Sequence, residues 1–299
     1  MMAPIVDEPR TVRVASADGR LNVAVWGDAG FPTVLLQHGI RDHGRSWDWT
    51  VAALAGRYQV VAPDLRGHGD SDHAGSYAIA DYVSDMAAVA DALALERFHL
   101  VGHSLGGVIG LRYAAAFPDR VAALCGIECI ELPIVRDQRE SPKTHPHRLR
   151  RWIEERRAGL RRRPRRYASA AEAEARLAEG RPELDPATIA HLTRYATFAE
   201  TDGTVSWKYD NAARFRPPDD ADGRDLDAAL AAIECPVTLI YGDSGWIPLP
   251  PADRLGLLRD HRVVRVPNAG HWLHHERRDR FLDIVQTFLC QHQDTNPHA

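Results

Sequence analysis

The sequence predicts an α/β fold in which a mostly parallel, eight-stranded sheet is flanked by helices and interrupted by an inserted helical cap. Two features carry this prediction. The first half of the chain alternates short β-branched or leucine-rich runs with helical stretches, as sheets with parallel strands and crossover helices do. A strand pattern then returns near the C-terminus, after a long stretch that lacks one.

The elements of the sheet follow in order along the chain. Strands are predicted at 11–15, 21–26, 33–37, 58–62, 98–102 and 121–127. Residues 78–95 and 105–117 place apolar residues three and four apart, which is the spacing of amphipathic or buried helices, and these two are the predicted crossovers. The sheet resumes at 236–242 and 261–267, and a helix over 276–290 closes the chain.

Residues 134–232 form the predicted cap. This stretch is rich in Arg, Ala and Glu, contains several prolines and shows no strand pattern. The predicted catalytic core is therefore split into residues 1–133 and 233–299. The Arg-rich run from Arg148 to Arg166 is interpreted as a solvated cap helix, because glutamates interrupt its charge.

Composition narrows the class of protein. The chain has 299 residues, 44% of them hydrophobic, and a formal net charge of -4, so it can bury a large core and has no global field that attracts nucleic acid. No apolar run approaches the roughly 20 residues needed to cross a bilayer. We expect a cytoplasmic monomer or homodimer that binds a small-molecule substrate, without nucleic acid, membrane or cofactor. The four cysteines lack C-x-x-C spacing and predict free thiols, buried at Cys125, Cys235 and Cys290.

Ser104 is the predicted nucleophile. An apolar strand runs into Gly102-His103-Ser104-Leu105-Gly106 and then into a helix, which is G-x-S-x-G in the strand–turn–helix setting that the motif requires. The serine must occupy a strained turn, where side chains at the flanking glycines would clash with neighbouring backbone. The N-terminus of the following helix favours the negative charge that develops there.

Two backbone N–H groups are the predicted oxyanion donors. One belongs to Leu105, directly after the serine, and the other to Ile40, because His38-Gly39 lets the chain turn close to the reacting carbon. His38 itself is predicted mainly to pack and to bond to backbone, with catalysis as a minor alternative.

His271 is the predicted base. It follows a strand and a short loop in VVRVPNAGHW, and a neutral imidazole can both take the serine proton and return it to a leaving group. His274, His275 and Glu276 resemble part of a metal cluster, but no third segment has zincin-like spacing. They are interpreted as the start of the last helix, and no metal is expected.

The segments TVLLQHG, APDLRGHGDSD, LVGHSLGG and VPNAGHWLHHE resemble the α/β-hydrolase superfamily over the whole non-cap part of the chain. The resemblance implies a triad carboxylate three residues after Gly242, but that position holds Gly245. A glycine cannot orient an imidazole. One branch of the haloalkane dehalogenases places its acid after the sixth strand, and by this resemblance Glu128 becomes the favoured acid. Asp243 is the first alternative and Glu131 the second.

The resemblance to dehalogenases does not extend to halide displacement, because they use an aspartate nucleophile where this chain has Ser104. Hydrolysis of an ester, lactone or thioester through an acyl-serine is the leading hypothesis. A lyase or cyclase using the same base, and a non-catalytic ligand-binding protein, are the alternatives. The substrate pocket is predicted between the sheet edge and the cap, with candidate residues His38, His103, Trp47, Trp49, Trp207, Tyr209 and Trp246.

Overall fold

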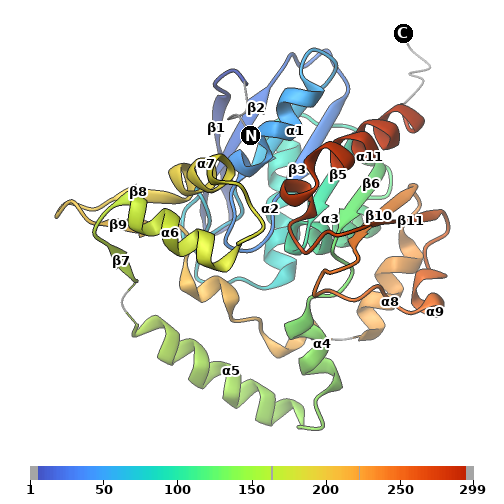
Figure 1. Ribbon diagram of the computed structural model, residues 1–299. Coiled ribbons are helices and arrows are strands. Elements are labelled where there is room, and N and C mark those ends of the chain that lie inside the picture. The colour runs from blue at the N-terminus through green and yellow to red at the C-terminus, as the bar shows by residue number, and fades with distance from the viewer. Residues whose placement is uncertain (1–5, 163, 222, 294–299) are drawn as a thin grey trace.

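The computed structural model describes residues 6–162, 164–221 and 223–293, and its centre is one eight-stranded sheet (Figure 1). The strand order is β1-β2-β4-β3-β5-β6-β10-β11. Pairing is antiparallel between β1 and β2 and between β2 and β4, and parallel across the rest of the sheet. The predicted fold class is confirmed. The strands are β1 (Arg10–Ser16), β2 (Gly19–Trp26), β3 (Thr33–Gln37), β4 (Gln59–Pro63), β5 (Phe98–His103), β6 (Val121–Ile127), β10 (Val237–Gly242) and β11 (His261–Val266).

Helices cover both faces of the sheet because each face is apolar. One face packs against α2, α3 and α8, and the other against α1 and α11, and each side forms its own buried hydrophobic cluster. The core helices are α1 (Asp48–Leu54), α2 (Ile79–Ala92), α3 (Leu105–Ala116), α8 (Gly223–Ala232), α9 (Ala252–Leu255), α10 (Leu273–Glu276) and α11 (Arg278–Gln291), with the 3₁₀ helix η1 at Gly44–Trp47. Within the described ranges, no helix combines the length and apolar character needed to cross a membrane.

The segment predicted as a purely helical cap also contains strands. A small antiparallel sheet of order β7-β9-β8 joins Arg166–Tyr167, Val205–Trp207 and Thr197–Ala199, so the expectation of no strand there is wrong. Strands of two or three residues are too short to show an alternating pattern. The helices of this segment are α4 (Pro133–Glu140), α5 (His145–Leu160), α6 (Ala170–Gly180) and α7 (Pro186–Ala196), followed by the 3₁₀ helices η2 (Asn211–Arg214) and η3 (Pro218–Ala221).

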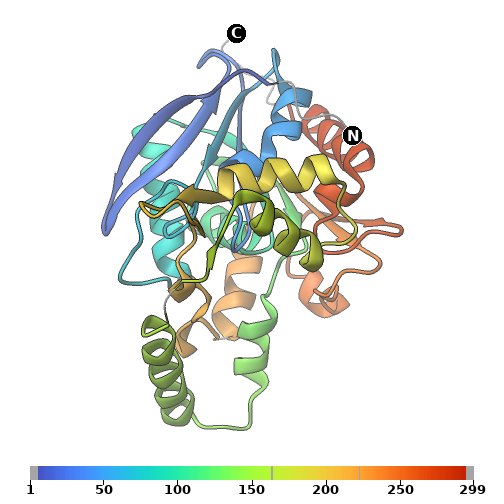
Figure 2. The same ribbon diagram turned by 60° about the vertical axis from the view of Figure 1, so that its left-hand side comes forward.

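The parts of the inserted segment lie in different places. In both views α5 lies at the periphery of the molecule, whereas α6 and α7 lie closer to the core (Figures 1 and 2). The Nε2 atom of His43, just before η1, lies 3.0 Å from the carbonyl oxygen of Leu192 on α7. Helix α8 packs on α3, and its Leu226 and Leu230 are buried in the main core.

The cysteines are free thiols, as predicted. Cys125 and Cys235 are buried, but Cys290 is exposed, which corrects the expectation for that residue. Its place in α11 explains the error: the buried face of this helix is formed by Phe281, Ile284, Val285, Phe288 and Leu289, and Cys290 lies outside that stripe.

The strand register brings distant segments to one edge of the sheet. His103 at the end of β5 is level with Ile127 at the end of β6, and Ile127 is level with Ile240 on β10. Gly242 at the end of β10 is level with Val266 on β11. The residues that follow these four strands therefore meet at the carboxyl edge, where open α/β sheets bind their ligands.

Candidate active site

Ser104 occupies a strained turn between β5 and α3. Its backbone has φ 52° and ψ -116°, a conformation that costs a non-glycine residue on the order of 1–3 kcal/mol. The turn is held by a hydrogen bond from the Ser104 N–H to the carbonyl oxygen of Ile127, 2.8 Å long. A Cβ atom at Gly102 would lie 2.6 Å from the Gly106 carbonyl oxygen, and one at Gly106 would lie 2.3 Å from that of Gln37. Only glycine fits at positions 102 and 106, two residues before and after this serine.

Glu128 follows β6 and is completely buried, with a backbone φ of 47°. Its Oε2 atom lies 3.3 Å from Nδ1 of His271, and its Oε1 atom accepts a hydrogen bond from the Gly242 N–H at 2.8 Å. Burial raises the pKa of Glu128 to about 7, although hydrogen bonds from the backbone N–H groups of Gly242 and Ile247 lower it. The structure thus brings together the predicted acid and the predicted base.

The glycine at position 245 belongs to the same arrangement. A Cβ atom there would lie 2.4 Å from Oε1 and 2.6 Å from Oε2 of Glu128. The Glu128 carboxylate therefore fills the space in which a side chain at position 245 would begin. A carboxylate supplied from β6 and one supplied from the loop after β10 exclude each other sterically, so the unusual glycine and the unusual glutamate have one physical explanation.

The two alternative acids lie elsewhere. Asp243 is exposed, and its Oδ1 atom accepts hydrogen bonds from the Ala269 N–H and the Ser244 hydroxyl. Glu131 is paired through both oxygens with the Arg139 guanidinium and also with Arg254. Among the described residues, neither carboxylate forms a hydrogen bond or ion pair with His271, so the geometry favours Glu128.

His271 is buried beside Trp246, whose ring centroid lies 3.9 Å from that of the imidazole. Burial, followed by the positive charge of Arg181, lowers the pKa of His271. The imidazole is therefore neutral at pH 7, as a base must be.

The Ser104 hydroxyl is buried and has no hydrogen-bond partner among the described residues, His271 included. Such catalytic hydrogen bonds are often long in the absence of substrate.

The predicted oxyanion donors border the same cavity as the serine. Ile40, Ser104 and Leu105 all line a cavity of about 610 Å³. A Cβ atom at Gly39 would lie 3.3 Å from Cβ of Ser104 and 2.9 Å from Nδ1 of His103, so glycine lets the chain pass close to the serine immediately before Ile40. Leu105 begins α3, whose first N–H groups have no intrahelical acceptor.

The aromatic residues predicted for the pocket divide into two groups. Trp207, Tyr209 and Trp246 line the cavity. Trp47 does not, because it is buried in the core, where it packs against His274 and Phe281. Trp49 also lies outside the cavity, where it packs edge-on against His191 and beneath the Arg278 guanidinium.

The two histidines predicted for the pocket are core residues. His38 is buried and accepts a hydrogen bond from the Leu65 N–H through Nε2. His103 is buried too, and its Nε2 lies 2.9 Å from the backbone carbonyl oxygen of His271. Because a carbonyl only accepts, His103 donates this bond and thereby supports the loop that carries His271. Both histidines therefore bond to backbone groups, and neither lines the cavity.

Residues 32–278 match a family model described as the alpha/beta hydrolase fold. The chain belongs to the α/β-hydrolase fold family. Among curated proteins, this α/β-hydrolase is 31% identical to the human serine hydrolase-like protein over 140 residues, which covers 46% of the chain and 69% of that protein. It is 44% identical to an uncharacterized protein of Mycobacterium bovis over 94 residues, 31% of the chain and 28% of that relative's length.

Two solved structures resemble the α/β-hydrolase over nearly its whole length. A hypothetical protein of Pseudomonas aeruginosa PAO1 has a TM-score of 0.82 at 25% identity and covers 95% of this chain and 100% of that one. An E-2-(acetamidomethylene)succinate hydrolase has a TM-score of 0.74 at 26% identity and covers 94% of this chain and 99% of the other. The fold is therefore shared over the core and the inserted segment together.

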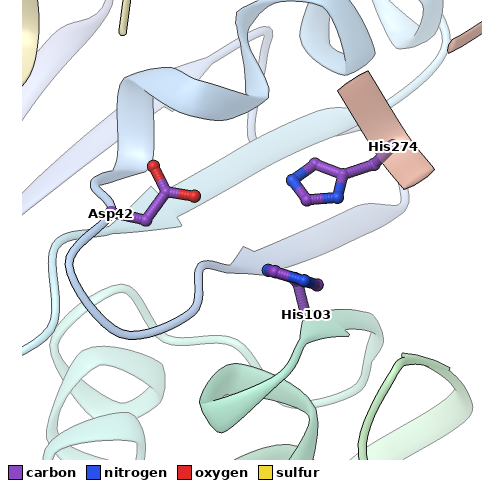
Figure 3. A group of neighbouring side chains, drawn as sticks. All are labelled: Asp42, His103 and His274. Atoms are coloured by element: carbon purple, nitrogen blue, oxygen red, sulfur yellow. The ribbon is translucent and has the colours of Figure 1, made fainter. Parts of the chain in front are cut away.

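Asp42, His103 and His274 form a buried polar group (Figure 3), and the ring centroid of His103 lies 4.7 Å from that of His271. Each offers one ligand atom, and these atoms lie within 4.8 Å of one another. Asp42 Oδ2, His103 Nδ1 and both ring nitrogens of His274 have no hydrogen-bond partner among the described residues. The sequence did not reveal this group, because its members come from three distant segments.

The donor types of this group suit a divalent cation. Its surroundings do not, because the positive charge of Arg181 contributes to lowering the pKa of both His103 and His274 and would repel a cation as well. We therefore assign no metal to the chemistry of the α/β-hydrolase.

The neighbouring Glu276 accepts hydrogen bonds from the N–H groups of Gly270 and Trp272, and so holds the loop around His271.

Proposed function

We propose that this α/β-hydrolase is a serine hydrolase that cleaves an ester, lactone or thioester of a small molecule through an acyl-Ser104 intermediate. The observation that carries the proposal is the strained serine at the wall of a cavity, at the sheet edge that also holds the hydrogen-bonded pair of His271 and Glu128. The names of two relatives, a serine hydrolase-like protein and an E-2-(acetamidomethylene)succinate hydrolase, support hydrolytic chemistry.

The proposed reaction begins with proton transfer from the Ser104 hydroxyl to Nε2 of His271 as the serine oxygen attacks the acyl carbon. Glu128 accepts the Nδ1–H of the imidazole, which fixes its orientation and stabilises the imidazolium that forms. The backbone N–H groups of Ile40 and Leu105 stabilise the oxyanion. The tetrahedral intermediate then collapses: the bond between the acyl carbon and the leaving group breaks, and His271 gives its proton to the leaving group.

The second half of the proposed reaction uses water. His271 removes a proton from a water molecule, whose oxygen attacks the acyl carbon of the ester on Ser104. Collapse of this second intermediate releases the carboxylic acid and restores the serine hydroxyl. The cavity of about 610 Å³ is within the range of small-molecule sites.

A kinetic experiment tests the proposal. With 4-nitrophenyl esters of increasing acyl length, mixed rapidly with the protein in H₂¹⁸O, we expect a burst of nitrophenolate and one ¹⁸O atom in each carboxylic acid released. The burst reports the acyl-enzyme and the isotope reports its hydrolysis. Release of nitrophenolate by folded protein no faster than in buffer would contradict the proposal, and turnover without isotope incorporation would favour a lyase or cyclase.

A further inference from the structure

The cavity beside Ser104 has an unusual charge. Among the residues that the structure describes, five arginines line it (Arg41, Arg176, Arg181, Arg214 and Arg216) and no aspartate, glutamate or lysine does. The whole chain carries a formal net charge of -4, so the positive lining runs against the overall balance. Because like charges gathered around a cavity focus its field, the cavity attracts anions.

Arg181 is the most informative of these residues. Arg181 is the first residue after α6 and is 8% exposed. Its guanidinium lies over the ring of Trp272, and the distance from Cζ to the ring centroid is 4.3 Å. Burial lowers the pKa of its guanidinium, and attraction from Asp42, Glu183 and Glu276 only partly opposes this effect. None of these carboxylates forms an ion pair with it, and in the part of the chain that the structure describes its guanidinium has no hydrogen-bond partner.

Arg216 is a second buried arginine of the cavity wall that forms no ion pair with a described residue. It is 1% exposed, donates through Nη1 to the carbonyl oxygen of Tyr77, and leaves Nη2 without a partner among the described residues. Its guanidinium lies over the Tyr82 ring, 5.1 Å from the centroid. Asp220 interacts electrostatically with Arg216 but forms no ion pair with it. Two buried guanidinium groups thus line one cavity without an ion pair to a carboxylate in the described part of the chain.

A buried arginine elsewhere in the molecule shows the usual arrangement. Arg66 is 2% exposed, and its Nε and Nη2 atoms donate to the two carboxylate oxygens of Asp85 at 2.6 and 2.8 Å. Asp18 adds a further ion pair at 2.9 Å. Burying a charge without such a partner is unfavourable, so an anion bound in the cavity would stabilise Arg181 and Arg216.

We propose that the substrate of the Ser104 site is an ester or thioester whose acyl group carries a carboxylate, and that Arg181 binds this carboxylate. The planar fork of arginine matches the two oxygens of a carboxylate. Trp207 and Tyr209, stacked with 6.2 Å between ring centroids, offer an apolar wall for the part of the substrate between its two ends. This inference rests on the proposed hydrolase function and specifies its substrate class.

The test compares two esters that differ only in charge: mono-4-nitrophenyl adipate and the same compound with its free carboxylate capped as a methyl ester. For the wild-type protein we expect kcat/KM to be about tenfold or more higher for the charged ester. Arg181→Met should lower the ratio of the two kcat/KM values, charged over capped, by about tenfold or more. Arg181→Lys, which keeps the charge, should lower this ratio less. Arg157→Met, which removes an exposed arginine outside the cavity, should leave the ratio at its wild-type value.

A binding measurement separates this inference from the proposed function. Calorimetry on Ser104→Ala should show binding of adipate, and the added Arg181→Met change should abolish it. If no ester is hydrolysed but adipate binds in this Arg181-dependent way, the hydrolase proposal fails and the anion site stands. Equal or faster wild-type hydrolysis of the capped ester overturns the substrate class while leaving the hydrolase intact, and binding of inorganic phosphate but not adipate overturns the choice of carboxylate.

Discussion

Replacing Ser104 with alanine is expected to lower kcat for 4-nitrophenyl ester hydrolysis by on the order of 10⁴- to 10⁶-fold. The change removes one oxygen atom, and with it the bond through which the acyl group is held. The remaining rate would come from the oxyanion donors and substrate binding alone.

A matched control is available in the same region. Ser244 is exposed in the loop after β10, and its hydroxyl bonds to Asp243, so Ser244→Ala should change kcat by about threefold or less. Thermal unfolding of both variants shows whether the fold is kept. Ser104→Ala that unfolds like the wild type but hydrolyses esters at a comparable rate is incompatible with an acyl-serine mechanism.

Removing the Glu128 carboxylate is expected to produce the second largest loss of kcat. Glu128→Ala should lower kcat by on the order of 10³- to 10⁴-fold, because His271 loses the group that orients it and stabilises its charged form. Asp243→Asn is the matched control, and its effect should be small, since an amide oxygen can still accept the hydrogen bonds from the Ala269 N–H and the Ser244 hydroxyl, and the exposed side chain forms no hydrogen bond or ion pair with His271. Steady-state kinetics on the two variants checks the assignment, and the opposite order of effects would make Asp243 the acid.

The contact with position 245 permits a sharper test of the same assignment. Gly245→Asp alone should inactivate or destabilise the protein, because its Cβ atom would lie 2.4 Å from Oε1 of Glu128 and would add a second carboxylate. When Gly245→Asp is combined with Glu128→Ala, the aspartate side chain enters the space that Glu128 vacated. The kcat of the double variant should then be about ten- to a hundredfold higher than that of Glu128→Ala, because the effects of changes at groups in contact are not additive. A double variant no better than Glu128→Ala would show that the vacated space does not position an acid.

The pH profile reports on the same group. Burial raises the pKa of Glu128 to about 7, so below that pH the carboxyl becomes protonated and no longer stabilises an imidazolium at His271. The wild-type kcat/KM should therefore fall as the pH drops below about 7. In the double variant the midpoint of this fall should move, because a different carboxyl then titrates.

The core elements could be predicted because their patterns are long and local. The runs that became β5, β6 and α3 are each at least six residues long and apolar on the face that packs, and G-x-S-x-G lies at the joint between the first and the last. Strands β7, β8 and β9 have two or three residues and form only because the folded chain places them side by side. No sequence period could reveal them.

The site could be predicted only in part, for a related reason. Ser104 and His271 follow strands whose ends meet at one edge, so their proximity follows from the fold class. The sequence does not distinguish Trp47 from Trp207, but Trp47 packs in the core and Trp207 lines the cavity. Their positions depend on packing between distant segments, which the local sequence pattern does not encode. The same holds for Arg181, which is one of many arginines in the sequence of the inserted segment and is distinguished only by where its side chain is buried.

The central claim is that Ser104 is an activated nucleophile, and covalent labelling with a fluorophosphonate measures this most directly. Intact-protein mass spectrometry should show one adduct per wild-type chain, peptide mapping should locate it on Ser104, and Ser104→Ala should not react. His271→Ala should react far more slowly, because the base that activates the serine is gone. Folded wild-type protein that forms no adduct, or forms one on another residue, would contradict the claim.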